Sequence, residues 1–147
     1  MIEAAALVAV MVAGTDWELD RPLHGPYRGI VAAASRIPGQ WRPFADCVSD
    51  RESGGSYTAR NATSSAAGRW QFLDTSWRVH GGIHYMVTAR LRAHGLPAPA
   101  AGDVRAFLRD TPIYRWPGPY QDTAFVAVLR SGGWHHWKGA HCDRLAP

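Results

Sequence analysis

CVSDRESGGSYTARN, residues 47–61, contains Glu52, one of only three glutamates in a chain with fifteen arginines. Before it, Phe44, Cys47 and Val48 lie at three- and four-residue steps, which is the spacing of one face of an α-helix. A pair of glycines follows and ends that helix, and glycines also let other groups approach closely. The stretch therefore predicts a helix that carries a scarce carboxylate at its end.

Helices are expected over most of the remaining chain, because apolar residues recur at helical spacing between proline and glycine breaks. A Pro/Ala-rich linker is expected between two of them, and a stretch rich in Ser, Thr, Asn and Gly is expected to form turns with a short hairpin. The predicted fold is a compact, mainly α domain with a small irregular or hairpin segment. The expected helices are residues 26–37, 43–53, 74–79, 84–94, 103–108 and 121–130, with the linker at 96–102 and the turns at 56–69.

Length and charge limit the classes of function. A chain of 147 residues with 46% hydrophobic content fits one domain with a single core. The formal net charge is +4, but the arginines are scattered and form no basic stripe, so no nucleic-acid partner is expected. A mild positive charge favours any anionic partner, including nucleic acid, acidic lipid or cell-wall polymer.

The N-terminus carries an apolar run at residues 4–14 that is too short to cross a bilayer, so no stable membrane insertion is expected. The run resembles the apolar part of a signal peptide, although Glu3 stands where a positive charge is usual. We interpret residues 1–25 as a signal segment or a packed helix with a connection, followed by one domain at 26–147.

Two cysteines, Cys47 and Cys142, leave two alternatives open. They are either two buried thiols, or one disulfide that ties the chain end to the helix carrying Glu52. We favour the disulfide, which would close a loop of roughly a hundred residues and contribute at most about 4–5 kcal/mol in the chain-entropy description. It would place the protein in an oxidising compartment.

Glu52 has two interpretations. As an exposed carboxylate at a helix end, it would pair with Arg51 or Arg60. At the edge of an apolar cleft, burial raises the pKa of a carboxyl group, which can then donate a proton to the leaving oxygen of a glycosidic bond. Aromatic and polar residues that could line such a groove follow downstream, at Tyr57, Trp70, Gln71 and Trp77.

Several motifs occur in a fixed order along the chain. Glu52 is followed by Ser-Gly-Gly, then by Gly-Arg-Trp-Gln-Phe at 68–72, then by Ser76-Trp77. The chain closes with Gly133, Trp134, Trp137 and Cys142. This ordered set resembles the lysozyme-like domain of resuscitation-promoting factors and related transglycosylase-like proteins of actinobacteria and their phages. The resemblance covers roughly residues 41–142, and residues 86–118 look like an insertion.

The resemblance implies an α+β lysozyme-like fold and a peptidoglycan-cleaving enzyme. Its bond would be the β-1,4 linkage between N-acetylmuramic acid and N-acetylglucosamine, with Glu52 as the general acid and Cys47–Cys142 as the disulfide of the family. It also implies a monomer at the extracellular cell wall, secreted or delivered by a phage, that binds glycan strands without cofactor or metal. The implied substrate contacts are Tyr57, Trp70, Gln71, Ser76, Trp77 and Trp134.

The chain departs from the family pattern at several places, which include the insertion at 86–118 and Ser76 where the family has Thr. The family cysteine directly precedes the glutamate, whereas Cys47 lies five residues earlier, and the spacing from Trp137 to Cys142 is longer. The family often has Gln before the final Gly-Trp, where this chain has Gly132. The missing Gln bears on activity more directly than the insertion does.

A second catalytic carboxylate is not evident. Of the candidates only Asp74 lies near the groove in the family pattern, and capping of a helix explains it equally well. The leading hypothesis is a mechanism with one carboxylate, in which the acetamido or 6-hydroxyl group of the substrate completes the reaction. The candidates are Asp46, Asp50, Asp74, Asp103, Asp110 and Asp122.

Three other interpretations compete with the enzyme. The main one is a non-catalytic lysozyme-like protein that binds the cell wall or serves structurally in a phage particle. The second is a zinc site at His80 and His84, with His135-His136 near the end of the chain. The segment between His80 and His84 lacks the glutamate of a zinc protease, and its two glycines disfavour the helix that such a site needs. A Cys-His peptidase centred on Cys47 requires a free thiol.

Overall fold

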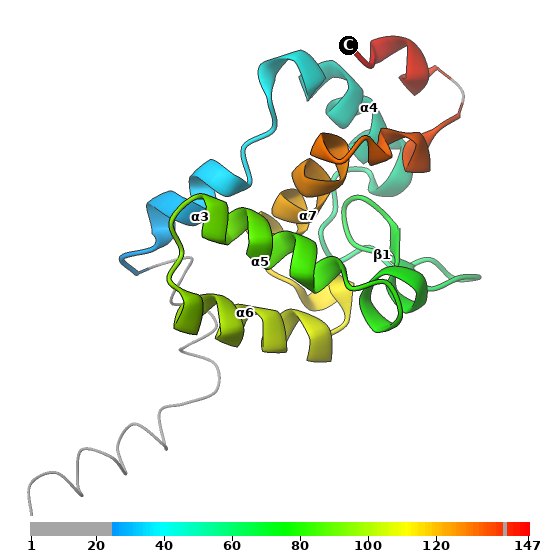
Figure 1. Cartoon of the computed structure of the whole chain (residues 1–147). Helices are drawn as coiled ribbons and strands as arrows, with labels where there is room; N and C mark the ends of the chain where they lie inside the picture. Colours follow the sequence, from blue (N-terminus) through cyan, green and yellow to red (C-terminus); the bar gives the residue numbers. More distant parts are fainter. Residues whose placement is uncertain (1–24, 140) are drawn as a thin grey trace, which may run out of the picture.

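The computed structural model describes residues 25–139 and 141–147, which form a mainly α structure with one small two-stranded sheet (Figure 1). The predicted fold class is confirmed at that level. The predicted N-terminal segment lies outside the described residues apart from Gly25. The elements are α3 (Arg28–Ala34), η1 (Gly39–Trp41), α4 (Arg42–Ser53), β1 (Ala66–Ala67), β2 (Phe72–Leu73), η2 (Thr75–Val79), α5 (Ile83–Ala93), α6 (Ala98–Asp110), η3 (Ile113–Arg115), α7 (Gly118–Arg130), η4 (Gly133–Trp137) and η5 (Cys142–Leu145).

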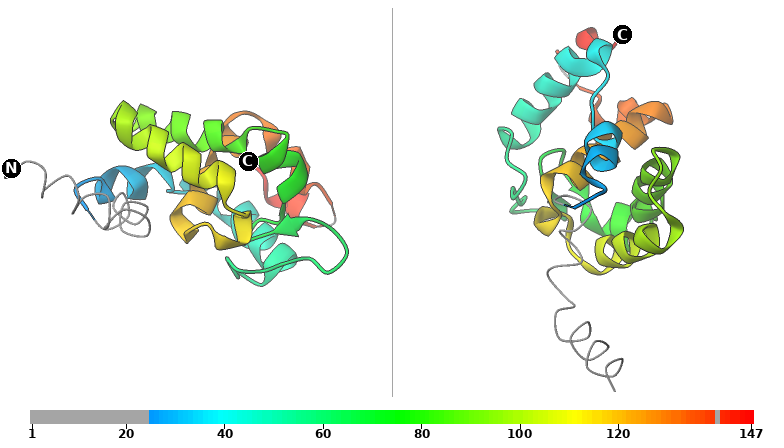
Figure 2. Two further views of the ribbon diagram at one scale, coloured as in Figure 1. Left: turned by 90° about the horizontal axis from the view of Figure 1, so that it is seen from below. Right: turned by 90° about the vertical axis from the view of Figure 1, so that its left-hand side faces the viewer.

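Helix α7 forms the centre of the core. Eight of its thirteen residues are buried, from Tyr120 to Leu129, which is the pattern of a helix covered on most of its sides. Helices α3 and α5 pack against it. Helix α6 packs on α5, and Figure 2 shows the two helices side by side. Among the described residues, no helix is long and apolar enough to cross a membrane.

Helix α4 carries the Glu52 stretch and has the predicted ends. Pro43 lies in its first turn, where the missing N–H of proline has no cost. Gly54 caps the C-terminus with φ of 61°, a left-handed conformation that glycine adopts without steric cost. Strands β1 and β2 follow and pair antiparallel, with Ala66 opposite Leu73 and Ala67 opposite Phe72.

Helix α6 corrects the prediction of a linker at residues 96–102. The helix runs over Ala98–Asp110, so the predicted short helix at 103–108 is only its second half. Pro99 lies in the first turn, where proline is compatible with a helix. Ala101, Val104 and Leu108 are buried at three- and four-residue steps. The proline and alanine content suggested a linker, but the apolar spacing continued through it.

Candidate active site

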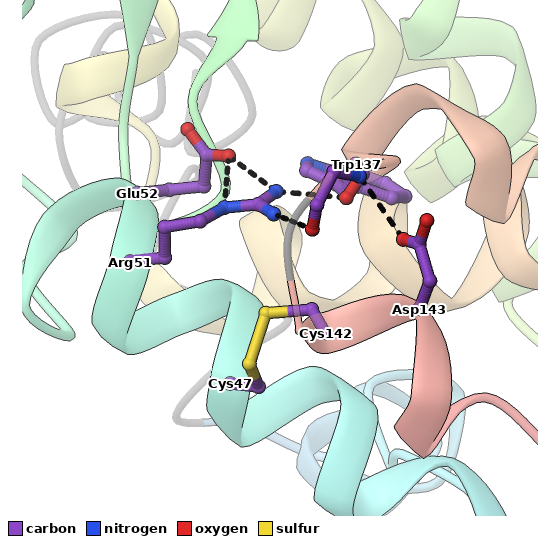
Figure 3. The surroundings of a disulfide bond; sticks show 7 residues. Cys47, Arg51, Glu52, Trp137, Cys142 and Asp143 are labelled. Atoms are coloured by element: carbon purple, nitrogen blue, oxygen red, sulfur yellow. Dashed lines mark hydrogen bonds and ion pairs between the residues drawn. A yellow bond between two sulfur atoms is a disulfide. The ribbon is translucent and has the colours of Figure 1, made fainter.

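Glu52 lies on the last turn of α4 and is partly buried, with 27% of its side chain exposed. Arg51 donates two hydrogen bonds to it, from Nε at 3.1 Å and from Nη2 at 2.8 Å. Both bonds end on Oε1, and Figure 3 shows the second carboxylate oxygen pointing away from Arg51. Of the two partners predicted for an exposed Glu52, the structure selects Arg51 rather than Arg60.

Arg51 also joins α4 to the end of the chain. Its Nη2 donates to the main-chain oxygen of Trp137 at 2.8 Å, and its Nη1 to that of Gly139 at 2.9 Å. One helical turn earlier on α4, Cys47 forms a disulfide with Cys142, and the two Cα atoms are 5.7 Å apart. The predicted disulfide is therefore present, and it lies beside the Glu52–Arg51 pair (Figure 3).

Asp122 on α7 accepts hydrogen bonds from three residues that lie elsewhere in the chain. Asp122 accepts hydrogen bonds from the Tyr57 hydroxyl at 2.6 Å, from Trp70 Nε1 at 3.0 Å and from Arg69 Nη1 at 3.4 Å. Burial raises the pKa of Asp122, although all three donors act in the opposite direction. The Nε of Arg69 donates to Ser49 Oγ at 2.8 Å, so the network fixes α4 against α7.

Gln121, next to Asp122, completes this framework. Its Nε2 donates to the carbonyls of Tyr57, Ile113 and Trp116 at 2.9, 3.0 and 3.0 Å. Its Oε1 accepts the main-chain N–H of Arg69 at 2.9 Å. One buried amide thus connects the loop after α4, the hairpin turn and the segment before α7.

The residues predicted to contact substrate lie in different surroundings. Trp70 is only 1% exposed and stacks on Phe125 at 3.7 Å between ring centroids. Its ring offers no open face to a sugar, so its position does not fit the predicted role. The hydroxyl of Tyr57 is occupied by Asp122, and the side-chain amide of Gln71 donates to the Gly68 carbonyl at 2.9 Å.

Trp77 is half-buried and is linked to the Glu52 region through other rings. Its ring lies edge-on to Phe72 at 5.3 Å, and Phe72 lies at 5.3 Å from Trp137, whose carbonyl holds Arg51. Ser76 beside it is exposed. Trp134 contacts other rings and packs at 5.9 Å from Phe44, nearer the start of α4.

Asp74 neither caps a helix nor faces the glutamate as a free carboxylate. It stands at the cap position of η2 but makes no side-chain capping bond there. Its oxygens instead accept bonds from Arg78 Nε and Nη2 at 2.9 and 2.6 Å and from the Ile113 N–H at 2.9 Å. Despite the cost of burial, these donors hold the pKa of Asp74 below its usual value, which leaves no proton to donate at neutral pH.

The other carboxylates predicted as candidates do not form a second catalytic group either. Asp46, Asp50 and Asp103 are exposed, and Asp110 pairs on the surface with Arg109 at 2.9 Å. Within the described residues, Asp122 is the candidate carboxylate with the most buried surroundings, and both of its oxygens already accept hydrogen bonds.

The structure bears on the predicted zinc site at His80 and His84 and on the predicted Cys-His peptidase centred on Cys47. Nδ1 of His84 is buried and has no hydrogen-bond partner among the described residues, whereas His80 is exposed. The described residues bring one set of metal-ligand types together, Cys47, His141 and Cys142, with ligand atoms within 4.8 Å of one another. The two sulfurs are bonded to each other, so neither thiolate is available to a metal or as a nucleophile.

Part of this chain is similar to a probable transglycosylase. Ninety residues, 61% of the chain, are 32% identical to the probable transglycosylase SceD of Staphylococcus aureus strain Newman, and the proteins of the same name from strains Mu3 and USA300 match equally. The chain spans only 29% of the length of these relatives. No protein-family model matches the sequence, and no solved structure matches it significantly.

The similarity supports a transglycosylase-like relationship at a coarse level. The three relatives are staphylococcal proteins, so they lend no support to an actinobacterial or phage origin. The sequence predicted the disulfide, which is present, and pointed to Glu52 as a candidate, but it gave no indication of the network around Asp122 and Gln121. The sequence carries no local signal for this network, since Asp122 and Gln121 take their partners Tyr57, Arg69 and Trp70 from 52 to 65 residues away along the chain.

Proposed function

We propose that the protein cleaves peptidoglycan at the β-1,4 bond between N-acetylmuramic acid and N-acetylglucosamine, with Glu52 as the general acid. The observation that carries the proposal is the setting of Glu52. It stands on the last turn of α4, and Arg51 occupies only one of its two carboxylate oxygens. The similarity to a probable transglycosylase supports the reaction class.

The single-carboxylate mechanism agrees with the surroundings of the other acids. Asp74 is tied to Arg78, and Asp122 to three donors, so neither is free to act as a second group. In the proposed reaction Glu52 gives a proton to the leaving oxygen as the bond to the anomeric carbon breaks. The 6-hydroxyl of the muramic acid residue then attacks that carbon and returns its proton to Glu52, which leaves an anhydro end.

The test is the loss of turbidity of purified peptidoglycan with the wild type, Glu52→Gln and Asp50→Asn. Glutamine keeps the size of the side chain and an acceptor for Arg51 but has no proton to give. We expect Glu52→Gln to lose at least about a hundredfold in rate, the lower range for a removed general acid. Asp50→Asn removes an exposed carboxylate from the same helix and is expected to behave as the wild type.

The released fragments separate two versions of the chemistry. Anhydro ends, identified by mass, support transglycosylation by the substrate's own hydroxyl. Reducing ends indicate hydrolysis by water instead. Full activity of Glu52→Gln would refute the role of Glu52 under either version.

A second candidate function is non-catalytic binding of the cell wall. The ion pair of Glu52 with Arg51 favours it, because an internal partner already occupies part of the carboxylate. If wild type and Glu52→Gln both pellet with the wall and neither clears it, the binding function is the correct one.

A further inference from the structure

We infer that Arg51 is a positioning residue for Glu52, and that the end of the chain fixes Arg51 through the disulfide. This inference rests on the proposed role of Glu52 as general acid. The part of the chain that holds Arg51 is called here the C-terminal clamp and consists of Trp137, Gly139, Cys142 and Asp143. Figure 3 shows Trp137 of the clamp and Glu52 on either side of the Arg51 guanidinium.

Four of the five N–H donors of the Arg51 guanidinium have hydrogen-bond acceptors. A guanidinium has five N–H donors in one plane. Two of them bond Oε1 of Glu52, at 3.1 and 2.8 Å, and two bond the carbonyls of Trp137 and Gly139, at 2.8 and 2.9 Å. The same rigid group therefore faces the glutamate on one side and the main chain of the clamp on the other.

The clamp is itself held at both ends. Trp137 is 4% exposed, and its Nε1 donates to the Trp70 carbonyl at 2.7 Å inside the core. The N–H of Gly139 donates to Asp143 Oδ1 at 3.0 Å. Beyond it, Cys142 is buried and covalently joined to α4. The two carbonyls that receive Arg51 are thus fixed by the core on one side and by the disulfide on the other.

This arrangement determines where Glu52 can point. A partly exposed glutamate can adopt several staggered rotamers, and only some direct an oxygen toward a substrate. Two bonds from one fixed guanidinium to Oε1 restrict those rotamers and leave the other oxygen available. Since a misplacement of about 1 Å can lower a rate by about a hundredfold, the restriction matters for catalysis.

Lysine cannot replace Arg51 in this role. Its ammonium is a single point with three donors, whereas the guanidinium reaches two carbonyls and a carboxylate from three separate nitrogens. Arg51→Lys keeps the charge beside Glu52 and removes the geometry. The matched control is Arg42→Lys at the start of the same helix, where the arginine is exposed and makes no ion pair within the described residues.

The experiment measures kcat and KM for soluble glycan fragments with Arg51→Lys, Asp143→Ala and the double variant. Asp143→Ala releases Gly139 but keeps the disulfide, so it loosens the clamp without removing a covalent bond. We expect Arg51→Lys to lower kcat at least about tenfold with KM changed less than about twofold, because orientation rather than binding is lost. We expect the double variant to be no slower than Arg51→Lys, since the clamp acts only through Arg51.

A Cys47→Ser/Cys142→Ser variant tests the covalent part of the clamp. We expect its kcat to fall and its combination with Arg51→Lys to add nothing further. Because loss of the disulfide lowers stability, each variant is assayed well below its own Tm. Should the cysteine variant not fold at the assay temperature, Asp143→Ala and its double variant with Arg51→Lys still test whether the clamp acts through Arg51.

The outcomes separate this inference from the proposed function. If Glu52→Gln is inactive but Arg51→Lys stays within twofold of the wild type, the positioning role is refuted and the general acid stands. If the losses from Arg51→Lys and Asp143→Ala multiply in the double variant, the clamp does not act through Arg51 and the inference is again refuted. Activity in Glu52→Gln, or none in the wild type, refutes both.

Discussion

Replacing Asp122 by alanine is expected to be strongly destabilising, because three donors lose their acceptor. Trp70 is only 1% exposed, so leaving its Nε1–H without the Asp122 acceptor costs about 1–3 kcal/mol. The Tyr57 hydroxyl and the Arg69 guanidinium are only partly buried and recover some bonding from water, which places each near the lower end of that range. The sum is about 3–5 kcal/mol, which is also the range for removing one partner of a buried ion pair.

The assay is urea unfolding at pH 7, followed by tryptophan fluorescence. Asp122→Asn is the matched control for Asp122→Ala, since the asparagine amide can still accept a hydrogen bond from Trp70 and can donate one to the hydroxyl of Tyr57. It should lose clearly less than Asp122→Ala. Asp103→Ala, an exposed aspartate on α6, should stay within about 0.5 kcal/mol of the wild type. A loss below about 1 kcal/mol for Asp122→Ala would contradict the reasoning.

The same variants have a pH signature with a defined sign. Because the pKa of Asp122 is raised in the folded state, the folded chain holds this proton more tightly than the unfolded chain. Its contribution to stability is therefore fully present below the unfolded pKa of about 3.9 and is lost as pH rises through the folded pKa. Relative to Asp122→Asn, the wild type should therefore lose stability as the pH rises. If the folded pKa of the carboxyl group were lowered instead, the wild type would lose stability relative to Asp122→Asn as the pH falls.

Two further predictions concern stability. In the same urea assay, Gly68→Ala should lower the free energy of unfolding by at least about 2 kcal/mol more than Gly54→Ala. Both glycines have positive φ, so the backbone strain is similar. A Cβ at Gly68 would overlap Oε1 of Gln121, whereas a Cβ at Gly54 would meet open space. Equal losses would mean that Gln121 can move aside. Burial, followed by the charges of Arg109 and Arg105, lowers the pKa of His84, so stability should fall as pH drops below about 6.5 toward the folded pKa, and this slope should shrink in His84→Gln. An unchanged slope would assign the effect to other groups.

Local patterns in the sequence were sufficient for the helix that carries Glu52. Its apolar spacing and the glycine that ends it act within a few residues, so they can be recognised without knowledge of the fold. Local composition was misleading at α6, where the prolines and alanines at 97–101 suggested a linker. Proline in the first turn of a helix is compatible with helix formation, and the buried stripe of α6 decided the outcome.

Trp70 and Asp122 illustrate what the sequence could not reveal. A tryptophan next to a motif can equally be a binding platform or part of the core, and only the packing of Phe125 and the bond to Asp122 assign it to the core. The candidate acids are likewise indistinguishable as letters. Their burial and partners differ because they face different neighbours in the folded chain.

The sequence by itself determined a mainly α chain, a helix with Glu52 in its last turn, and two cysteines that could tie the end of the chain to that helix. The tertiary structure alone decided that Arg51 takes one oxygen of Glu52 while two carbonyls from the end of the chain hold Arg51. The physical reason is the range of the interactions. Helical periodicity and glycine stops act over a few residues, whereas the hydrogen bonds that hold Arg51 join residues 86 and 88 positions apart, and these residues meet only when the core has formed.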